Sequence, residues 1–303
     1  MNLASPPEQM APVGNDVEIA FDDRGDPDDP AILLVPGLGT QLIYWDNDFC
    51  EMLVASGYRV IRMDNRDCGH STVLDQFGKP ALGPMMFGIP RKLAYSMSDM
   101  AADGIGVLDH LGIGSAHIAG FSMGGMIVQT MAIEHPHRVL SLTSIMSRTG
   151  AYKDALPGAK ELVALMKVGP EDLEGFLENM RRLADTIGSP AYPADPEWLH
   201  AQGVLAFERG LHRDGAARQL HAINCQPNRT RRLRKLDLPA LVIHGSADRL
   251  VFTRGGRATA RAIPGAKLRI YEGMGHDLPM ELWPQFAAEI AAIADRAKVG
   301  TPA

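Results

Sequence analysis

A chain of 303 residues, 46% of them hydrophobic and 22% charged, has the composition of a folded protein with a core. The length fits one large domain or two small ones, and a net charge of −6 argues against nucleic acid as a partner. The three cysteines, Cys50, Cys68 and Cys225, form neither a metal motif nor a disulfide framework, so we expect a reducing, cytoplasmic location. We also expect no signal peptide and no membrane span, because the apolar runs are short.

Apolar strands and amphipathic helices alternate in the first half of the chain. Short continuous apolar runs are typical of strands buried on both faces, whereas apolar residues at a spacing of 3.6 indicate helices. The predicted elements are an edge strand over Val17–Phe21, a strand over Ala31–Val35, a helix over Leu42–Ser56, a strand over Tyr58–Met63, a helix over Ser96–Leu111 capped by Ser98, a strand over Ser115–Gly120 followed by a helix, and a strand over Val139–Ile145.

The alternation stops after Ile145 and resumes at Ala240. Between them we predict helices over Pro157–Lys167, Glu171–Thr186, Glu197–His212 and Asp214–Ile223; after them a strand over Ala240–His244, a helix over Thr253–Ile263, a strand over Lys267–Tyr271 and a helix over Pro279–Ala297. Such alternation predicts an α/β fold with a doubly wound, mostly parallel sheet. We expect residues 1–146 and 237–303 to form the core and residues 147–236 a helical cap, or lid, inserted between strands.

The stretch Gly120-Phe121-Ser122-Met123-Gly124 stands between a buried strand and a run with helical spacing. This context is typical of a nucleophile elbow, in which the two glycines let strand and helix pack closely. Ser122 is therefore predicted as a nucleophile, and the backbone N–H of Met123 as a donor to a developing oxyanion. A glycine-rich turn with a capping serine is the plainer alternative, so a base and an acid must be sought.

The predicted base is His276. In open α/β sheets the chemistry lies beyond the C-terminal ends of the strands. Of ten histidines, His276 follows the last strand directly, in a loop with glycines on its N-terminal side. His70 lies farther from a strand end, His244 lies within or at the end of a strand, and His135 lies at the opposite edge of the sheet.

The predicted acid is Asp248, which follows the first strand after the cap. The other usual position, after the strand ending at Ile145, offers no carboxylate before Asp154. Asp248 would fix the tautomer of His276 and stabilise its imidazolium form. Glu272 and Asp277 rank lower, because residues so close to the histidine in sequence rarely face it.

Together these motifs resemble the α/β-hydrolase superfamily over nearly the whole chain, and the order nucleophile, acid, base matches that superfamily. The motifs Arg66–Ser71 and Ser98–Asp103 resemble those of bacterial esterases and lipases related to aclacinomycin methylesterase. The elbow is also similar to that of cofactor-free haloperoxidases. The motifs that carry the resemblance are Gly37-Leu38-Gly39, Asp64-Asn65-Arg66-Asp67-Cys68-Gly69-His70-Ser71, Gly120–Gly125, Gly245–Asp248 and Gly273–His276.

The resemblance implies that the N–H of Leu38 is the second oxyanion donor. Many members have His-Gly where this chain has Pro36-Gly37, so the histidine contact that stabilises the loop is lost while the Leu38 N–H is kept. Cys68 lies away from the elbow, so we interpret it as a packed small residue.

The favoured function is hydrolysis of a small-molecule carboxylic ester through an acyl-enzyme, with no cofactor and no metal. Perhydrolysis, C–C bond, lactone or thioester hydrolysis on the same scaffold are alternatives, and a non-catalytic ligand-binding protein is a remote one. Ser122 excludes a haloalkane dehalogenase or an epoxide hydrolase, because both need an acid at the elbow. Gly37-x-Gly39 is not a dinucleotide-binding motif, because it lacks the third glycine.

Substrate selectivity is expected to lie in the cap and in the loop Val73–Tyr95, which is a candidate wall of the acyl pocket. The basic run Arg229–Lys235 is interpreted as a solvated face between cap and core. The oligomeric state is left open, with a homo-oligomer among the alternatives.

Overall fold

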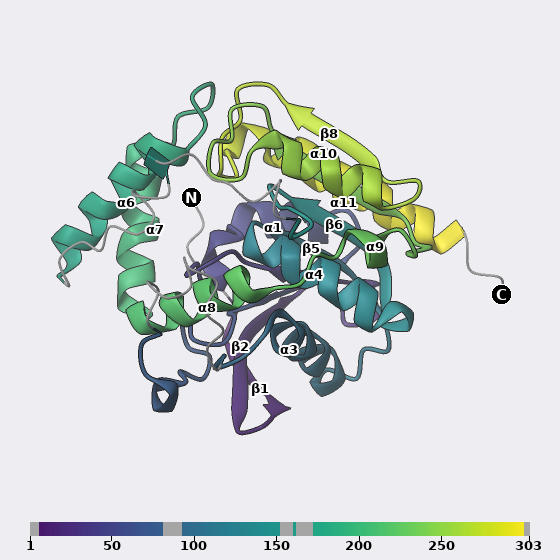
Figure 1. The fold of residues 1–303 in the computed structure, drawn as a ribbon, viewed down its shortest axis with the longest axis horizontal. Helices are drawn as coiled ribbons and strands as arrows, with labels where there is room; N and C mark the ends of the chain where they lie inside the picture. The colour runs from purple at the N-terminus through teal and green to yellow at the C-terminus, as the bar shows by residue number, and fades with distance from the viewer. Residues whose placement is uncertain (1–5, 81–92, 152–159, 162–171, 300–303) are drawn as a thin grey trace.

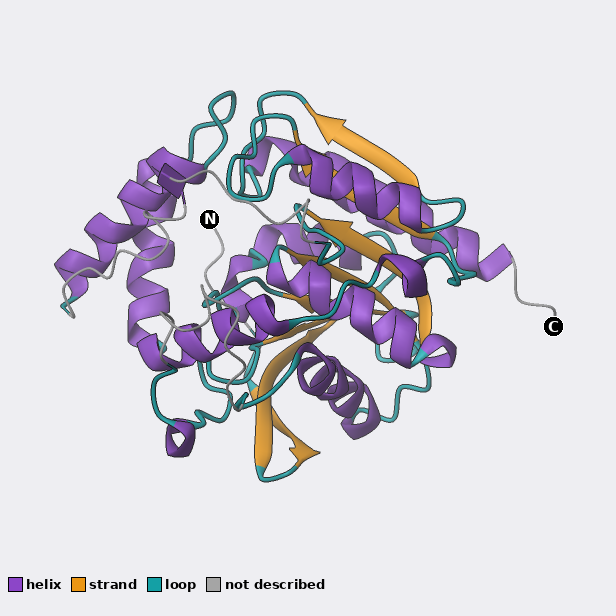
Figure 2. Cartoon of the chain, viewed as in Figure 1, coloured by secondary structure: helices purple, strands orange, loops and turns teal. Residues whose placement is uncertain are grey.

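The computed structural model describes residues 6–80, 93–151, 160–161 and 172–299. Strands and helices alternate along most of the described chain (Figure 2). The strands are β1 Gln9–Gly14, β2 Val17–Arg24, β3 Ala31–Val35, β4 Arg59–Met63, β5 Ala116–Phe121, β6 Val139–Ile145, β7 Ala240–Gly245 and β8 Lys267–Tyr271. The α-helices are α1 Asn47–Val54, α3 Met97–His110, α4 Met123–Glu134, α6 Leu173–Ile187, α7 Pro196–Glu208, α8 Arg213–Cys225, α9 Thr230–Leu233, α10 Thr253–Ala262 and α11 Trp283–Val299.

The eight strands form one sheet in the order β1-β2-β4-β3-β5-β6-β7-β8. Strands β3 to β8 pair in parallel, whereas β2 pairs antiparallel with both β1 and β4. The register sets Val35 beside Gly120, and Phe121 beside Ile145, so the ends of β3, β5 and β6 meet at one edge. This arrangement confirms the predicted doubly wound fold and places the elbow at the centre of that edge.

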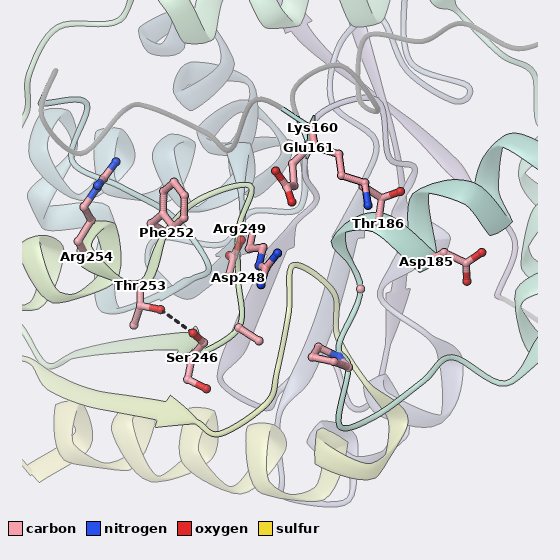
Figure 3. A pocket seen from close by; sticks show the side chains of 13 residues that line it. Lys160, Glu161, Asp185, Thr186, Ser246, Asp248, Arg249, Phe252, Thr253 and Arg254 are labelled. Atoms are coloured by element: carbon pink, nitrogen blue, oxygen red, sulfur yellow. Dashed lines mark hydrogen bonds between the residues drawn. The ribbon is translucent and has the colours of Figure 1, made fainter.

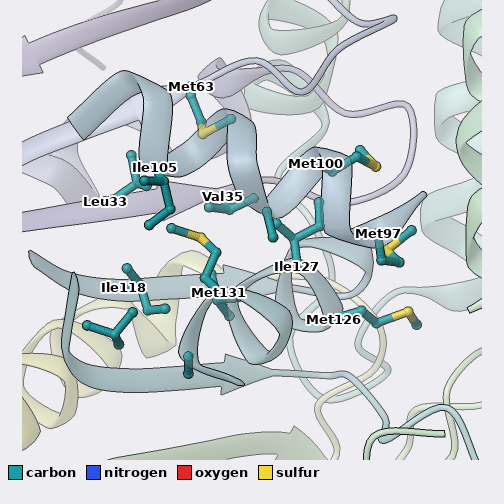
Figure 4. Packing of buried hydrophobic residues seen from close by; sticks show 14 of the residues in the cluster. Leu33, Val35, Met63, Met97, Met100, Ile105, Ile118, Met126, Ile127 and Met131 are labelled. Atoms are coloured by element: carbon teal, nitrogen blue, oxygen red, sulfur yellow. The ribbon is translucent and has the colours of Figure 1, made fainter. Parts of the chain in front are cut away.

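Helices cover both faces of the sheet and bury two apolar cores (Figure 1). On one face α3 and α4 pack together, and this core is rich in methionine, including Met97, Met100, Met126 and Met131 (Figure 4). The other face carries α1 and α11, and its core includes the stacked rings of Trp45 and Phe49. Unbranched methionine side chains fill the irregular space left where two helices cross a strand.

Helices α6, α7 and α8 lie together to one side of the sheet, away from α11 (Figure 1). They correspond to three of the four helices predicted between Ile145 and Ala240. Asp172 and Asp195 cap α6 and α7 by accepting backbone N–H groups, which explains where these two helices begin. The fourth predicted helix, Pro157–Lys167, lies almost wholly outside the described residues. Residues 81–92 of the loop that we expected to wall the pocket also lie outside them. The domain boundaries stay a prediction.

Three local predictions were wrong in detail. The strand that begins at Val17 is not at the sheet edge, because β1 precedes it and pairs with it. The helix predicted over Leu42–Ser56 is broken: a 3₁₀ turn over Leu42–Tyr44 ends at Trp45, and Asp46 then caps α1. Ser96, not Ser98, caps α3, because its hydroxyl and the Asp99 carboxylate satisfy each other's backbone N–H groups in a capping box.

The basic run Arg229–Lys235 is only partly a solvated face. Its first residue, Arg229, is 1% exposed, and Leu233 is fully buried. The Arg229 guanidinium donates to the side chain of Gln129 at 3.2 Å and to the Arg148 carbonyl at 2.9 Å. Burial is the main cause that lowers the pKa of Arg229 to about 9. This arginine therefore fastens the start of α9 to α4 and to the segment after β6, which its charge alone did not reveal.

Candidate active site

Ser122 occupies a sharp turn between β5 and α4. Its backbone has φ of 53° and ψ of −116°, a left-handed conformation that few non-glycine residues adopt. A Cβ on Gly120 would lie 2.4 Å from the Gly124 carbonyl oxygen, and a Cβ on Gly124 only 2.1 Å from that of Val35. Both glycines are thus required by close backbone approach, as the elbow interpretation expects.

Two further hydrogen bonds hold the turn. The Ser122 N–H donates to the Ile145 carbonyl at 2.9 Å, and the Ser147 hydroxyl donates to the Ser122 carbonyl at 2.7 Å. Both partners come from β6 and the residues just after it. The strained serine is therefore held by the neighbouring strand as well as by its own helix.

The structure brings Ser122, His276 and Asp248 into one hydrogen-bonded chain. His276 Nε2 lies 2.9 Å from Ser122 Oγ, and His276 Nδ1 lies 2.8 Å from Asp248 Oδ2. A carboxylate only accepts, so Nδ1 carries the hydrogen and the Nε2 lone pair faces the serine hydroxyl. This is the tautomer that can take a proton from Ser122.

The Asp248 carboxylate is 2% exposed and surrounded by donors. Burial by itself would raise its pKa, but the charge of His276 and the hydrogen bonds from His244 and His276 outweigh burial and lower the pKa of Asp248. Its Oδ1 accepts the N–H groups of Leu250 and Val251, both at 2.9 Å. The carboxylate is therefore ionised and fixed in orientation.

Asp277, next to the histidine, is turned to another partner. Its carboxylate accepts the Ser189 hydroxyl and, at 3.1 Å, the Ser189 N–H. The Ser189 hydroxyl also accepts the Gly275 N–H at 2.8 Å, and the His276 N–H donates to the Ile187 carbonyl at 2.7 Å. The segment that follows α6 thus fixes the backbone of the histidine loop.

The loop that follows β3 lies beside the serine. A Cβ on Gly37 would lie 3.4 Å from Ser122 Cβ and 2.8 Å from the Phe121 ring. The partly buried Leu38 comes next, and Met123, fully buried, is the first residue of α4. Both predicted oxyanion donors therefore belong to segments that flank Ser122.

Two side chains from other segments hold the loop that follows β3. Asn65 donates its amide N–H to the Pro36 carbonyl at 3.0 Å. Gln219, a fully buried residue of α8, accepts the Gly39 N–H at 2.8 Å and donates to the Arg66 carbonyl at 2.8 Å. Helix α8 thereby sets the orientation of the peptide next to Leu38.

Ion pairs join α7 and α8 to the loop after β4. Arg218 makes a bidentate pair with Asp67, with both N–O distances 2.7 Å. Arg209 pairs with Asp64 and donates from Nε to Gln41 at 2.7 Å. These pairs are buried, so they hold α7 and α8 in a fixed position against the loop after β4.

Cys68 and His70 take no part in the hydrogen-bonded chain. Cys68 is buried and donates to the Thr40 carbonyl at 3.3 Å; burial raises the pKa of its thiol well above the ordinary value. This fits the interpretation of Cys68 as a packed residue, since a reactive cysteine needs a lowered pKa. His70 lies 2.7 Å from the carboxylate of Glu8.

An open cavity of about 650 Å³ adjoins the acid rather than the nucleophile (Figure 3). Asp248 and Arg249 line it, with Lys160 and Glu161 on its other side. The described residues that line it include neither Ser122 nor His276. We therefore do not regard it as the acyl pocket. Within the described part of the chain, no three or more histidine, cysteine or acidic side chains are arranged to hold a metal, and no helix could cross a membrane.

Comparison with known proteins agrees with this geometry. The family model for the alpha/beta hydrolase fold matches residues 30–281. The chain belongs to this family, as its motifs predicted. Rhodomycin D methylesterase DnrP of Streptomyces peucetius is 31% identical over 298 residues, covering 92% of this chain and 95% of the relative.

A second relative and a solved structure are also similar to this chain. A 2-hydroxy-6-oxononadienedioate/2-hydroxy-6-oxononatrienedioate hydrolase of Burkholderia vietnamiensis is 28% identical, covering 87% of this chain and 86% of the relative. Among solved structures, the esterase RhEst1 from Rhodococcus sp. ECU1013 has a TM-score of 0.74 at 20% identity, covering 95% of this chain and 98% of that one. The structural likeness shows the fold alone.

Sequence reasoning missed several residues that support the site. Gln219, Ser147 and Ser189 each hold one of its segments in place. None carries a local signal, because each acts through a contact made only after distant segments fold together. His244 was considered as a base but not as a partner of Asp248, although a spacing of four residues at a strand end could have suggested it.

Proposed function

We propose that this protein is a serine hydrolase that cleaves carboxylic esters through an acyl-enzyme. The observation that supports it best is the chain of hydrogen bonds from Ser122 through His276 to Asp248 at a strained elbow. The similarity to a methylesterase over nearly the whole chain favours an ester as substrate.

In this mechanism His276 takes the hydroxyl proton of Ser122 as the oxygen attacks the ester carbonyl. The backbone N–H groups of Leu38 and Met123 donate to the oxyanion of the tetrahedral intermediate. The imidazolium, stabilised by Asp248, gives its proton to the departing alkoxide. Water activated by His276 then attacks the acyl-enzyme, and the carboxylic acid leaves.

C–C bond hydrolysis is the second candidate. It is favoured by the relatives named for hydrolysis of 2-hydroxy-6-oxononadienedioate and of 2-hydroxymuconate semialdehyde, at 28% identity. Such a reaction would use the same described side chains, so the substrate rather than the triad distinguishes the two candidates.

A series of p-nitrophenyl esters from acetate to palmitate tests the proposal, with 2-hydroxymuconate semialdehyde as the competing substrate. We expect the purified protein to hydrolyse esters and Ser122→Ala to lose the rate by several orders of magnitude while keeping its circular dichroism spectrum. A long-chain optimum would mark a lipase. A folded protein that cleaves only the semialdehyde would replace the ester proposal with the second candidate.

A further inference from the structure

His244 contacts the same carboxylate oxygen of the acid, Oδ2 of Asp248, that the predicted base contacts. It is the fifth residue of β7 and is fully buried. Its Nε2 lies 2.6 Å from the Val251 carbonyl oxygen and 3.2 Å from Asp248 Oδ2. One ring nitrogen thus faces two acceptors at once.

The surroundings define which nitrogen carries the hydrogen. A carbonyl oxygen only accepts, so Nε2 must be the donor. Nδ1 is buried and has no hydrogen-bond partner among the described residues. A Cβ on Gly256 would lie 2.4 Å from that nitrogen, so the ring is packed against backbone. An N–H at Nδ1 would be buried without an acceptor, which favours the neutral ring protonated at Nε2.

His244 adds one hydrogen-bond donor to those around the Asp248 carboxylate. Oδ1 of Asp248 accepts the N–H groups of Leu250 and Val251, and Oδ2 accepts Nδ1 of His276 at 2.8 Å. The Nε2–H of His244 bonds the Val251 carbonyl at 2.6 Å and also faces Oδ2 at 3.2 Å, where it is the fourth donor; a carboxylate has about four lone-pair positions. Without it, Oδ2 would be held by His276 alone.

We propose that His244 is a positioning residue that holds Oδ2 of Asp248 in line with His276. The inference rests on the proposed function, because it assigns a role relative to the triad. A neutral donor is suited to this role: it orients the carboxylate and spreads its charge without forming a competing ion pair. Val251 takes part as well, because its carbonyl accepts the same Nε2–H at 2.6 Å and so fixes the His244 ring.

Three substitutions separate positioning from simple packing. His244→Gln keeps an amide N–H that can reach the Nε2 position, His244→Asn keeps a polar side chain too short to reach it, and His244→Leu removes the donor. The control is His117→Leu: His117 is 2% exposed in β5 and bonded to Ser141 Oγ at 2.9 Å, at the opposite end of the strand from the elbow.

With p-nitrophenyl butyrate, we expect kcat of His244→Leu and His244→Asn to fall roughly 10- to 100-fold at nearly constant KM, the range of outer-shell contacts that orient a reactive group. His244→Gln should stay within about threefold of the parent. The acid limb of the kcat/KM profile should move to higher pH in the Leu and Asn variants, because a carboxylate with fewer donors holds the imidazolium proton more strongly. His117→Leu should lose thermal stability but keep the kcat and pH profile of the parent.

Equal kcat values and pH profiles for the Gln and Asn variants would overturn the proposal, and that pair decides the matter even if the Leu variant fails to fold. Failure of the proposed function gives a different pattern, because the parent would then not hydrolyse the ester, or Ser122→Ala would hydrolyse it as fast as the parent. Loss of activity in Ser122→Ala together with unchanged kcat in all three His244 variants would leave the triad standing and remove only the role of His244.

Discussion

The Gly39 N–H donates to the Gln219 side chain at 2.8 Å across a sequence separation of 180 residues. The donor belongs to the loop after β3, and the acceptor to cap helix α8. The position of the Leu38 N–H therefore depends on the cap, not on the loop sequence alone.

Gln219→Met tests this dependence, because methionine keeps the length and loses both hydrogen bonds. We expect kcat to fall about tenfold with little change in KM, since the contact matters mainly where charge develops on the oxyanion. Gln202→Met is the matched control: Gln202 is a buried cap glutamine bonded to Asp46 at 3.1 Å. Steady-state kinetics that show equal losses of kcat in both variants would contradict the account.

The close approach of Gly124 to β3 makes a second prediction. A Cβ there would lie 2.1 Å from the Val35 carbonyl oxygen, which is backbone and cannot move aside. We expect Gly124→Ala to lose about 3 kcal/mol or more in the free energy of unfolding. Gly114→Ala, where nothing lies within 4 Å of the added Cβ, should change it little. Urea unfolding compares the two variants, and equal stabilities would refute the packing argument.

Substitution of the two acids near His276, Asp248 and Asp277, should lower kcat to very different extents. Asp248→Asn would reverse the hydrogen bond to Nδ1 and favour the wrong tautomer, so we expect kcat to fall by about 10³–10⁴. Asp277→Asn should stay within about tenfold, because Asp277 faces Ser189. A larger loss of kcat in the Asp277 variant would reassign the acid.

The pair between Arg218 and Asp67 predicts a dependence of stability on pH. Burial alone would raise the pKa of Asp67, but hydrogen bonds from Arg218, the Leu74 N–H and Tyr95 lower it. An unfolded aspartate titrates near about pH 4. The contribution of the Arg218–Asp67 pair to the free energy of unfolding is therefore complete above that pH. It is lost as the pH falls through the lower pKa that Asp67 has in the folded state.

Arg218→Met should accordingly lower the free energy of unfolding by about 3–5 kcal/mol at pH 7, by leaving a buried charge without its partner, and by less below about pH 4. Arg138→Met is the control: its partner Asp109 is 59% exposed, so we expect a loss below about 1 kcal/mol at either pH. Denaturant unfolding at both pH values measures the difference. An Arg218 effect that does not change with pH would contradict the assignment.

Local signals predicted much of the fold and the site. Buried strands, terminal glycines and the elbow spacing indicated β3 to β8, and chain order led to Ser122, Asp248 and His276, which the structure brings together. Strand β1 was missed because its run, from Gln9 to Gly14, is mostly exposed and contains a proline. Contacts across the fold, such as Gln219 with Gly39, cannot be read from local periodicity, since either partner alone fits an ordinary loop or helix position.

The most direct test of the central claim is covalent labelling with a fluorophosphonate, followed by mass spectrometry of the tryptic peptides. An activated serine displaces fluoride and forms an oxygen–phosphorus bond, so we expect one adduct, on Ser122. Labelling should disappear in Ser122→Ala and slow by orders of magnitude in Asp248→Asn. An adduct on another serine, or equal labelling of the parent and Ser122→Ala, would contradict the assignment of Ser122 as the nucleophile.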